Sequence, residues 1–198
     1  MTGAEAEAVT RREQILGTAA TLFARRGFHG VSVVDIGAAC GISGPALYKH
    51  FTGKGQILAE MLVSISERLL TVGQDRVRAA SGPADAVRRL VDWHVDFAVH
   101  HQALIIVQDR DWSSLPDAAR DRVRTLQREY VDLWADQLRL LDPGVGVADS
   151  QARAHATFGL INSTPHSGLL PEARMRTLLA QMAVRALGLP ADDRGAPS

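Results

Sequence analysis

Cysteine and long apolar runs are scarce in this sequence, and each scarcity excludes a class of protein. Cys40 is the single cysteine among 198 residues, so no intramolecular disulfide framework can form. The longest strongly apolar run spans 103–107, far short of the roughly 20 residues that cross a bilayer. The first residues, MTGAEAEAV, are acidic where a secretory signal would be basic. We therefore expect a cytoplasmic protein in which Cys40 is a small apolar core residue.

Motifs of catalysis and metal binding are also missing. The sequence contains no nucleophile elbow, no glycine-rich phosphate loop and no paired carboxylates within an apolar stretch, so we expect that the protein is not an enzyme. Seven histidines are present, but no HxxxH pair and no acidic partner stands at ligand spacing. The sequence therefore predicts no catalytic residue, no metal site and no cofactor.

The net charge is zero, which argues against a nucleic-acid partner until the positions of the charges are considered. The segment 9–55 holds six basic residues against two acidic ones, and both lysines of the chain lie in it. A basic segment in a neutral protein is better explained by a polyanionic partner than by a solvated face. The six basic residues are Arg11, Arg12, Arg25, Arg26, Lys49 and Lys54.

Residues 32–54 predict two short helices joined by a tight turn. Ser32 and Asp35 have the spacing of a capping box, so the first helix begins at about Ser32. Gly41 can adopt the positive φ of a tight turn, Ser43 caps the second helix, and Pro45 fits its first turn. A helical hairpin without a special role is the plain alternative, because helix, glycine turn and helix are common in all-α proteins.

The second of these helices, GPALYKHF, has a composition that suits the DNA major groove. Gly44 and Ala46 are small enough for close approach to another surface, while Tyr48, Lys49 and His50 carry hydrogen-bonding and cationic groups. This mixture favours a recognition helix.

The stretch from about Thr10 to Leu58 resembles the N-terminal DNA-binding domain of the tetracycline-repressor (TetR) family. Four positions depart from the family pattern: Gly37 and Cys40 replace a usual Ala, Ala46 a frequent Thr and Gly55 a common Glu. Gly37 and Cys40 should loosen the first helix, and Ala46 cannot make a hydroxyl contact to a base. The matching residues are Ala19, Phe23, Gly27, Phe28, Ser32, Val33, Ile36, Gly41, Ser43, Leu47, Tyr48, His50, Phe51 and Lys54.

This resemblance implies a homodimer that binds palindromic half-sites of an operator and responds to a small molecule. Tyr48 and Lys54 are expected to contact phosphates, and Lys49 to face the groove. The full set of expected DNA-binding residues is Ser32, Ser43, Gly44, Pro45, Ala46, Tyr48, Lys49, His50 and Lys54.

The rest of the chain also predicts helices, without strand patterns or internal repeats. A first long helix opens at Thr10 with Glu13 at the capping-box position, and Pro165 predicts a kink in a helix from about 149 to 169. We expect an all-α fold of about nine helices. Its predicted parts are a DNA-binding domain at 1–55, an effector-binding and dimerisation domain at 56–190, and a disordered tail at 191–198.

The last two predicted helices carry the expected dimer interface. Small residues recur on one face of the first of them, which lets another helix come near, and the resemblance places the dimer on these two helices. The expected interface residues are Ala152, Ala156, Gly159, Ser163, Leu178 and Met182.

An effector pocket is predicted where polar side chains interrupt the apolar faces of the C-terminal helices. The segment FGLINSTPHSG, 158–168, could instead be shaped for dimer packing, or its polar groups could satisfy the carbonyls freed by Pro165. It resembles a segment in a branch of the family linked to acyl-CoA and lipid catabolism. The expected walls are His94, Phe97, His101, Tyr130, Trp134, Asn162 and His166.

Taken together, these patterns predict a ligand-responsive repressor that is released by a hydrophobic or amphipathic effector. Two alternatives stay open: a DNA-binding activator that needs no effector, and a helical small-molecule-binding protein or enzyme without a role on DNA. The first alternative is distinguished from a ligand-responsive repressor by whether any small molecule changes the affinity for DNA. The second is distinguished by whether the protein binds genomic fragments in a shift assay.

Overall fold

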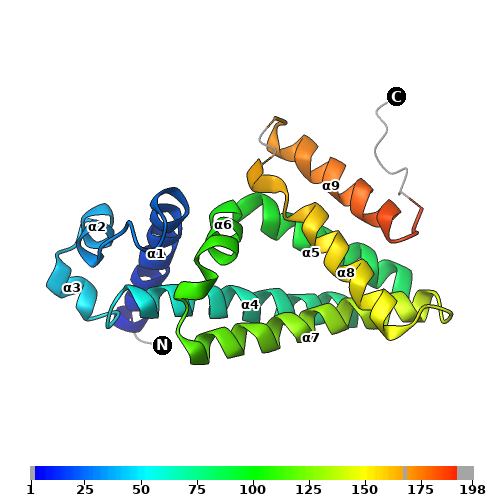
Figure 1. The fold of residues 1–198 in the computed structure, drawn as a ribbon, viewed down its shortest axis with the longest axis horizontal. Coiled ribbons are helices and arrows are strands. Elements are labelled where there is room, and N and C mark those ends of the chain that lie inside the picture. The colour runs from blue at the N-terminus through cyan, green and yellow to red at the C-terminus, as the bar shows by residue number, and fades with distance from the viewer. Residues whose placement is uncertain (1–2, 167–168, 191–198) are drawn as a thin grey trace. The chain divides into compact units, whose positions relative to one another are not determined.

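The computed structural model describes residues 3–166 and 169–190, in which all regular elements are helical (Figure 1). The predicted all-α class is confirmed. The helices are α1 Gly3–Arg26, α2 Val33–Ala39, α3 Gly44–Tyr48, α4 Lys54–Arg78, α5 Pro83–His100, α6 Gln102–Asp111, α7 Asp117–Leu141, α8 Val147–Ile161 and α9 Glu172–Ala186, with 3₁₀ turns η1 Trp112–Ser114 and η2 Thr164–His166.

The chain divides into two compact units, and neither is continuous in sequence. The N-terminal unit extends to residue 65 and includes 103–124, and the C-terminal unit contains 66–102 and the residues from 125 onward. The N-terminal unit is larger than the expected 1–55 domain because Val107, Leu115 and Val123 complete its apolar core. The expected disordered tail, 191–198, lies outside the described residues.

Phenylalanine and branched aliphatic side chains form the core of the N-terminal unit. Phe23 of α1, Leu47 of α3 and Leu58 of α4 are fully buried there, and Phe51 precedes α4 in the same cluster. Cys40 is also buried in this cluster as a free thiol, which agrees with its expected role as a small apolar residue.

In the C-terminal unit, α9 packs along α5 and α8, and α5 also contacts α8 (Figure 1). Helix α4 approaches α7 very closely at Gly73, where an added Cβ would lie 2.8 Å from Cε2 of Tyr130. This close approach brings the aromatic side chains of α7 into the interior of the unit.

Two predicted helix boundaries are wrong. The first helix begins at Gly3 rather than Thr10, because the alanines and glutamates of residues 4–8 are strong helix formers that continue it upstream. Helix α8 ends at Ile161 instead of continuing with a kink to about 169. Pro165 has no N–H to donate to the Ile161 carbonyl, so the chain leaves the α-helix and forms the short turn η2.

Within the described ranges, none of the helices combines the length and apolar character needed to cross a membrane. The same residues include no group of three or more His, Cys, Asp or Glu side chains arranged to hold a metal ion.

Candidate DNA-binding surface and effector site

The α2–α3 segment has the capping geometry that its sequence predicts. The Asp35 N–H donates to Ser32 Oγ at 3.1 Å, and the Ser32 N–H donates to the Asp35 carboxylate at 2.8 Å. Hydrogen bonds from the hydroxyl and backbone of Ser32 lower the pKa of Asp35. Gly41 forms the turn with φ of 67°, and Ser43 Oγ accepts from the Ala46 N–H at 3.3 Å. These bonds confirm both predicted helix starts.

Helix α3 has one buried face and one exposed face. Leu47 is completely buried and anchors the helix to the core, whereas Tyr48 has 57% of its surface exposed. Lys49, Ser43 and Pro45 are exposed as well. Of the remaining expected contacts, Gly44, Ala46 and His50 are half-buried. The exposed side of α3 therefore presents a phenol and an ammonium, both groups that can contact DNA.

Lys54, which is expected to contact a phosphate, makes two hydrogen bonds inside the protein. Its Nζ donates to the carbonyl oxygens of Phe28 at 2.9 Å and Val31 at 3.0 Å, and it lies 4.5 Å from the centre of the Phe28 ring. Two of its three hydrogens are thus used inside the protein. Lys54 thus joins residues 28–31, the loop that leads into α2, to the start of α4, and its phosphate contact stays a prediction.

The two lysines should therefore respond differently to substitution by alanine. Lys49→Ala should weaken binding to DNA of any sequence and make the salt dependence of log K shallower by about one, because one phosphate-neutralising charge is lost. Lys54→Ala should instead lower the thermal unfolding midpoint, since the carbonyls of Phe28 and Val31 lose their hydrogen-bond donor. Titrations of DNA at several salt concentrations, together with thermal unfolding, separate these effects. Equal salt slopes for wild type and Lys49→Ala would show that Lys49 is not at the DNA.

An aromatic cluster in the C-terminal unit contains most of the expected effector-site residues. The His94 ring of α5 stacks on Phe158 of α8 with centroids 4.6 Å apart, and on Tyr130 of α7 at 5.8 Å. Trp134 meets the edges of the Phe158 and His94 rings at 5.0 and 6.0 Å, and Phe97 lies 5.9 Å from His94. We call these five side chains the aromatic cluster.

Polar atoms inside the aromatic cluster hydrogen-bond with one another. His94 Nε2 lies 3.2 Å from Asn162 Oδ1, and His94 Nδ1 lies 3.4 Å from the Tyr130 hydroxyl. Burial lowers the pKa of His94 to about 4 and raises the pKa of Tyr130 well above its usual value. Trp134 Nε1 is also buried, without a hydrogen-bond partner among the described residues.

Two residues expected to line the effector site, His101 and His166, lie outside the aromatic cluster. One member of the cluster, Phe158, was not predicted from the sequence. His166 is exposed in η2, because α8 ends before it, and His101 is half-buried with its ring 5.4 Å from Phe97. Phe158 was not predicted, although it stacks on His94 and Tyr130. Its position four residues before Asn162 was the available signal, since such a pair shares a helix face.

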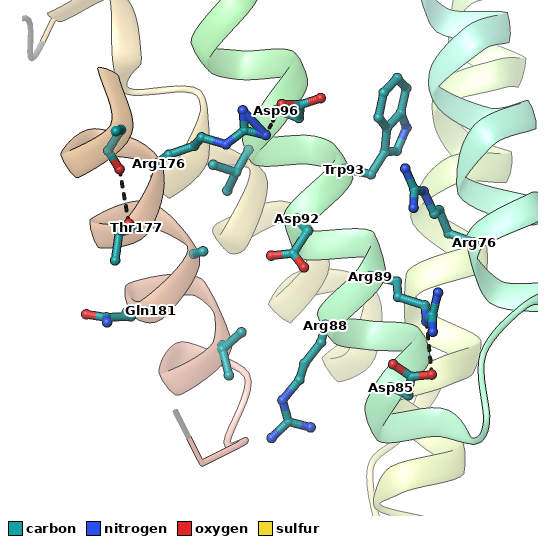
Figure 2. A pocket seen from close by; sticks show the side chains of 14 residues that line it. Arg76, Asp85, Arg88, Arg89, Asp92, Trp93, Asp96, Arg176, Thr177 and Gln181 are labelled. Atoms are coloured by element: carbon teal, nitrogen blue, oxygen red, sulfur yellow. Dashed lines mark hydrogen bonds and ion pairs between the residues drawn. The ribbon is translucent and has the colours of Figure 1, made fainter. Parts of the chain in front are cut away.

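A separate groove of about 880 Å³ runs between α5 and α9 (Figure 2). Arg89 donates to Asp85 at 2.9 Å on one of its sides, and Arg176 reaches across to pair with Asp96 on the other. None of the aromatic cluster lines this groove. Its charged walls do not suit an apolar molecule, and the aromatic cluster as the effector site stays a prediction.

The face expected to form the dimer interface is exposed in the single chain. Helix α8 buries Ser150, Ala154, Thr157 and Ile161, whereas Ala152, Ala156, Gly159 and Ser163 are exposed. On α9, Leu178 and Met182 keep 40% and 45% of their surface exposed. The assignment of these six residues to a dimer interface stays a prediction.

Residues 15–61 match the family described as "Bacterial regulatory proteins, tetR family", and residues 80–187 match the family described as "Tetracyclin repressor-like, C-terminal domain". The chain is 29% identical over 153 residues to the HTH-type transcriptional repressor KstR2 of Mycolicibacterium smegmatis, covering 77% of this chain and 72% of KstR2.

Solved structures share the fold. A TetR-family transcriptional regulator from Bordetella parapertussis superposes with a TM-score of 0.77 at 24% identity, covering 87% of this chain and 93% of that one. The regulator FadR from Bacillus subtilis in complex with stearoyl-CoA gives 0.69 at 14% identity, covering 88% and 98%.

Proposed function

Because the chain belongs to the tetracycline-repressor family of bacterial regulatory proteins, we propose that it represses transcription by binding an operator as a homodimer and is released by a small effector. The observation that carries the DNA-binding part is the capped α2–α3 pair, in which Leu47 anchors α3 while Tyr48 and Lys49 remain exposed. A helix presented in this way can enter the major groove. We propose that the direct DNA contacts lie within residues 1–55.

Release follows from the geometry of a two-fold dimer. Two recognition helices reach successive major grooves when they are about 34–36 Å apart, or a multiple of that distance. An effector that binds more tightly to a dimer with another spacing weakens operator binding. The size of the effect is the difference in its binding free energy between the two dimer conformations, and tenfold release needs a difference of about 1.4 kcal/mol.

The effector is proposed to be a hydrophobic or amphipathic molecule that binds against the aromatic cluster. Four of the cluster's five rings are almost fully buried, so the effector binds only when they move apart, and Asn162, the Tyr130 hydroxyl and the Trp134 indole would then orient it. An acyl-CoA is the first candidate, because the regulator FadR with the same fold was crystallised with stearoyl-CoA.

Selection of genomic fragments by the purified protein tests the proposal. The expected result is enrichment of a few fragments that contain an inverted repeat, with competition by these fragments and not by random DNA. Stearoyl-CoA and shorter acyl-CoAs are then added to the complex, with free CoA as the control for the nucleotide part. Failure to enrich any sequence would contradict a role on DNA, and enrichment without an effect of any small molecule would favour the effector-independent alternative.

His94→Leu and Asn162→Leu should reduce release by the effector and leave effector-free operator binding near normal. His94→Leu removes a polar group of the aromatic cluster and Asn162→Leu removes its hydrogen-bond partner, and a ligand group that pairs with either would lose roughly 1–3 kcal/mol. The concentration of acyl-CoA that releases half of the operator measures the effect. Thr177→Leu, at an exposed position of α9 outside the aromatic cluster, is the control. Unchanged release by both variants would place the effector elsewhere.

A further inference from the structure

Arg110, near the end of α6, binds the C-terminal end of α1 from 86 residues away in sequence. Its Nη1 donates to the Ala24 carbonyl at 3.0 Å, and its Nη2 donates to the Phe23 carbonyl. The last carbonyls of an α-helix have no partner within the helix and lie at the negative end of its dipole. The guanidinium from α6 therefore stabilises the end of α1: it binds the Ala24 carbonyl and adds a second donor to the Phe23 carbonyl, which also accepts from the Gly27 N–H at 2.8 Å.

Asp111 holds this guanidinium in position. Its carboxylate is buried, with 7% of the side chain exposed, and it accepts from Arg110 Nε at 3.3 Å and Nη2 at 3.1 Å. A bidentate pair fixes the plane of a guanidinium, and a buried carboxylate needs the paired cation. Arg110 and Asp111 thus form one unit, which we call the α6 clamp.

Residues 27–32, the loop from α1 to α2, are held by further contacts of the same region. Ser114 of η1 hydrogen-bonds with His29, with Oγ and Nε2 3.1 Å apart, and Lys54 binds the Phe28 and Val31 carbonyls. The loop ends at Ser32, the N-cap of α2. The direction in which α2 and α3 leave α1 is therefore fixed by contacts with α6, η1 and the start of α4.

Both chain connections of the clamp segment lead to helices of the aromatic cluster. Helix α5, which carries His94 and Phe97, is separated from α6 by the single residue His101. After η1 the chain enters α7, which carries Tyr130 and Trp134. The backbone therefore joins the segment that binds the end of α1 to both α5 and α7.

We propose that the α6 clamp is a positioning element for DNA binding, which sets the placement of α2–α3 by fixing the end of α1. This inference rests on the proposed function and adds a specific route to it. Arg110 and Asp111 do not contact DNA in this proposal; they fix the end of α1, and through it the loop into the recognition helices.

Operators with altered half-site spacing test the proposal. Arg110→Gln and Asp111→Asn should lower affinity for the selected operator by roughly tenfold. The same variants should reduce the discrimination against operators whose half-sites are one base pair nearer or farther apart, because a loosened α1 end permits more than one placement of α3. Asp109→Asn, which removes the same charge from an exposed position of α6, should stay within about twofold of wild type.

All affinities are measured at a temperature where circular dichroism shows each variant to be fully folded. If Arg110→Gln does not fold, Arg110→Lys replaces it in the experiment. Lysine keeps the charge but lacks the planar fork, so it should show the same loss of spacing discrimination. Wild-type affinity and spacing discrimination in folded clamp variants would overturn the inference, even if their unfolding midpoints fall. If wild-type protein selects no DNA, the proposed function itself fails.

Discussion

A Gly159→Leu variant is expected to be a folded monomer that no longer binds its operator at concentrations where the wild-type protein saturates it. Gly159 is exposed on α8, and a Cβ added there would meet no atom of the chain within 4 Å. The monomer therefore has room for leucine, and replacing a helical glycine favours its fold by roughly 1 kcal/mol. Any harm must arise between two copies of the chain.

The size of the effect follows from symmetry. Overpacking a close contact costs about 1–3 kcal/mol, and a two-fold interface contains the substitution twice. A loss of about 2–6 kcal/mol corresponds to a dimer roughly 30-fold to 10⁴-fold weaker. Sedimentation equilibrium measures the dimer, and an operator titration measures the consequence for DNA.

Arg153→Leu, at an exposed position of α8 outside the row of small residues, is the matched control and should remain a dimer. An intact dimer in Gly159→Leu, or a monomeric wild-type protein at micromolar concentration, would contradict the interface assigned to α8 and α9.

The titration of His94 should by itself lower the free energy of unfolding by about 3 kcal/mol as the pH falls from about 6.5 to about 4. The pKa of His94 is about 4 in the folded protein because the ring is buried, against an ordinary value of 6.5. Between these values the unfolded chain binds a proton that the folded chain does not, so acid favours unfolding. Above pH 6.5 the contribution of His94 is complete, and below pH 4 no further loss comes from this residue.

His94→Phe tests this expectation, because phenylalanine keeps a flat ring between Phe158 and Tyr130 and cannot titrate. Urea unfolding curves at half-unit pH steps should show the loss in wild type and in His155→Phe, whose histidine is exposed. In His94→Phe the fall between pH 6.5 and 4 should be smaller by about 3 kcal/mol, and what remains comes from groups such as His101, whose pKa burial also lowers. The same slope in all three proteins would show that another group is responsible.

The helix-turn-helix could be predicted because its determinants are neighbours in sequence. Ser32 and Asp35 cap each other three residues apart, and Ser43 caps α3 in the same way. The role of Lys54 could not be predicted by the same means. Its acceptors are the carbonyls of Phe28 and Val31, which lie 26 and 23 residues away, and only the folded unit brings them to the ammonium.

The candidate effector site was predicted in part for a related reason. Helical periodicity places His94, Tyr130 and Trp134 on buried faces, which the structure confirms. His166 was placed four residues after Asn162 on an assumed continuous helix. The missing N–H of Pro165 ends α8 at Ile161, so this spacing no longer puts the two side chains on one face.

Gly37 illustrates how a departure from a family pattern can have a local structural reason. We expected glycine to loosen α2, yet the residue is buried where the chain turns back, and the Ile42 N–H donates to its carbonyl at 2.9 Å. An added Cβ at this position would lie only 3.0 Å from the Ile42 carbonyl oxygen. Glycine thus permits a tight closure of the turn between the two helices.

The discontinuity of the N-terminal unit has a consequence for the order of events during synthesis on the ribosome. Val107, Leu115 and Val123 are core residues of a unit whose other members end at residue 65. At roughly 5–20 residues per second, the nascent chain waits about 3–12 s between the emergence of residue 65 and that of residue 124. During this interval α1–α4 are outside the tunnel with part of their apolar core uncovered. The DNA-binding half is therefore the first to be made and is completed only after α5 and α6 have been added.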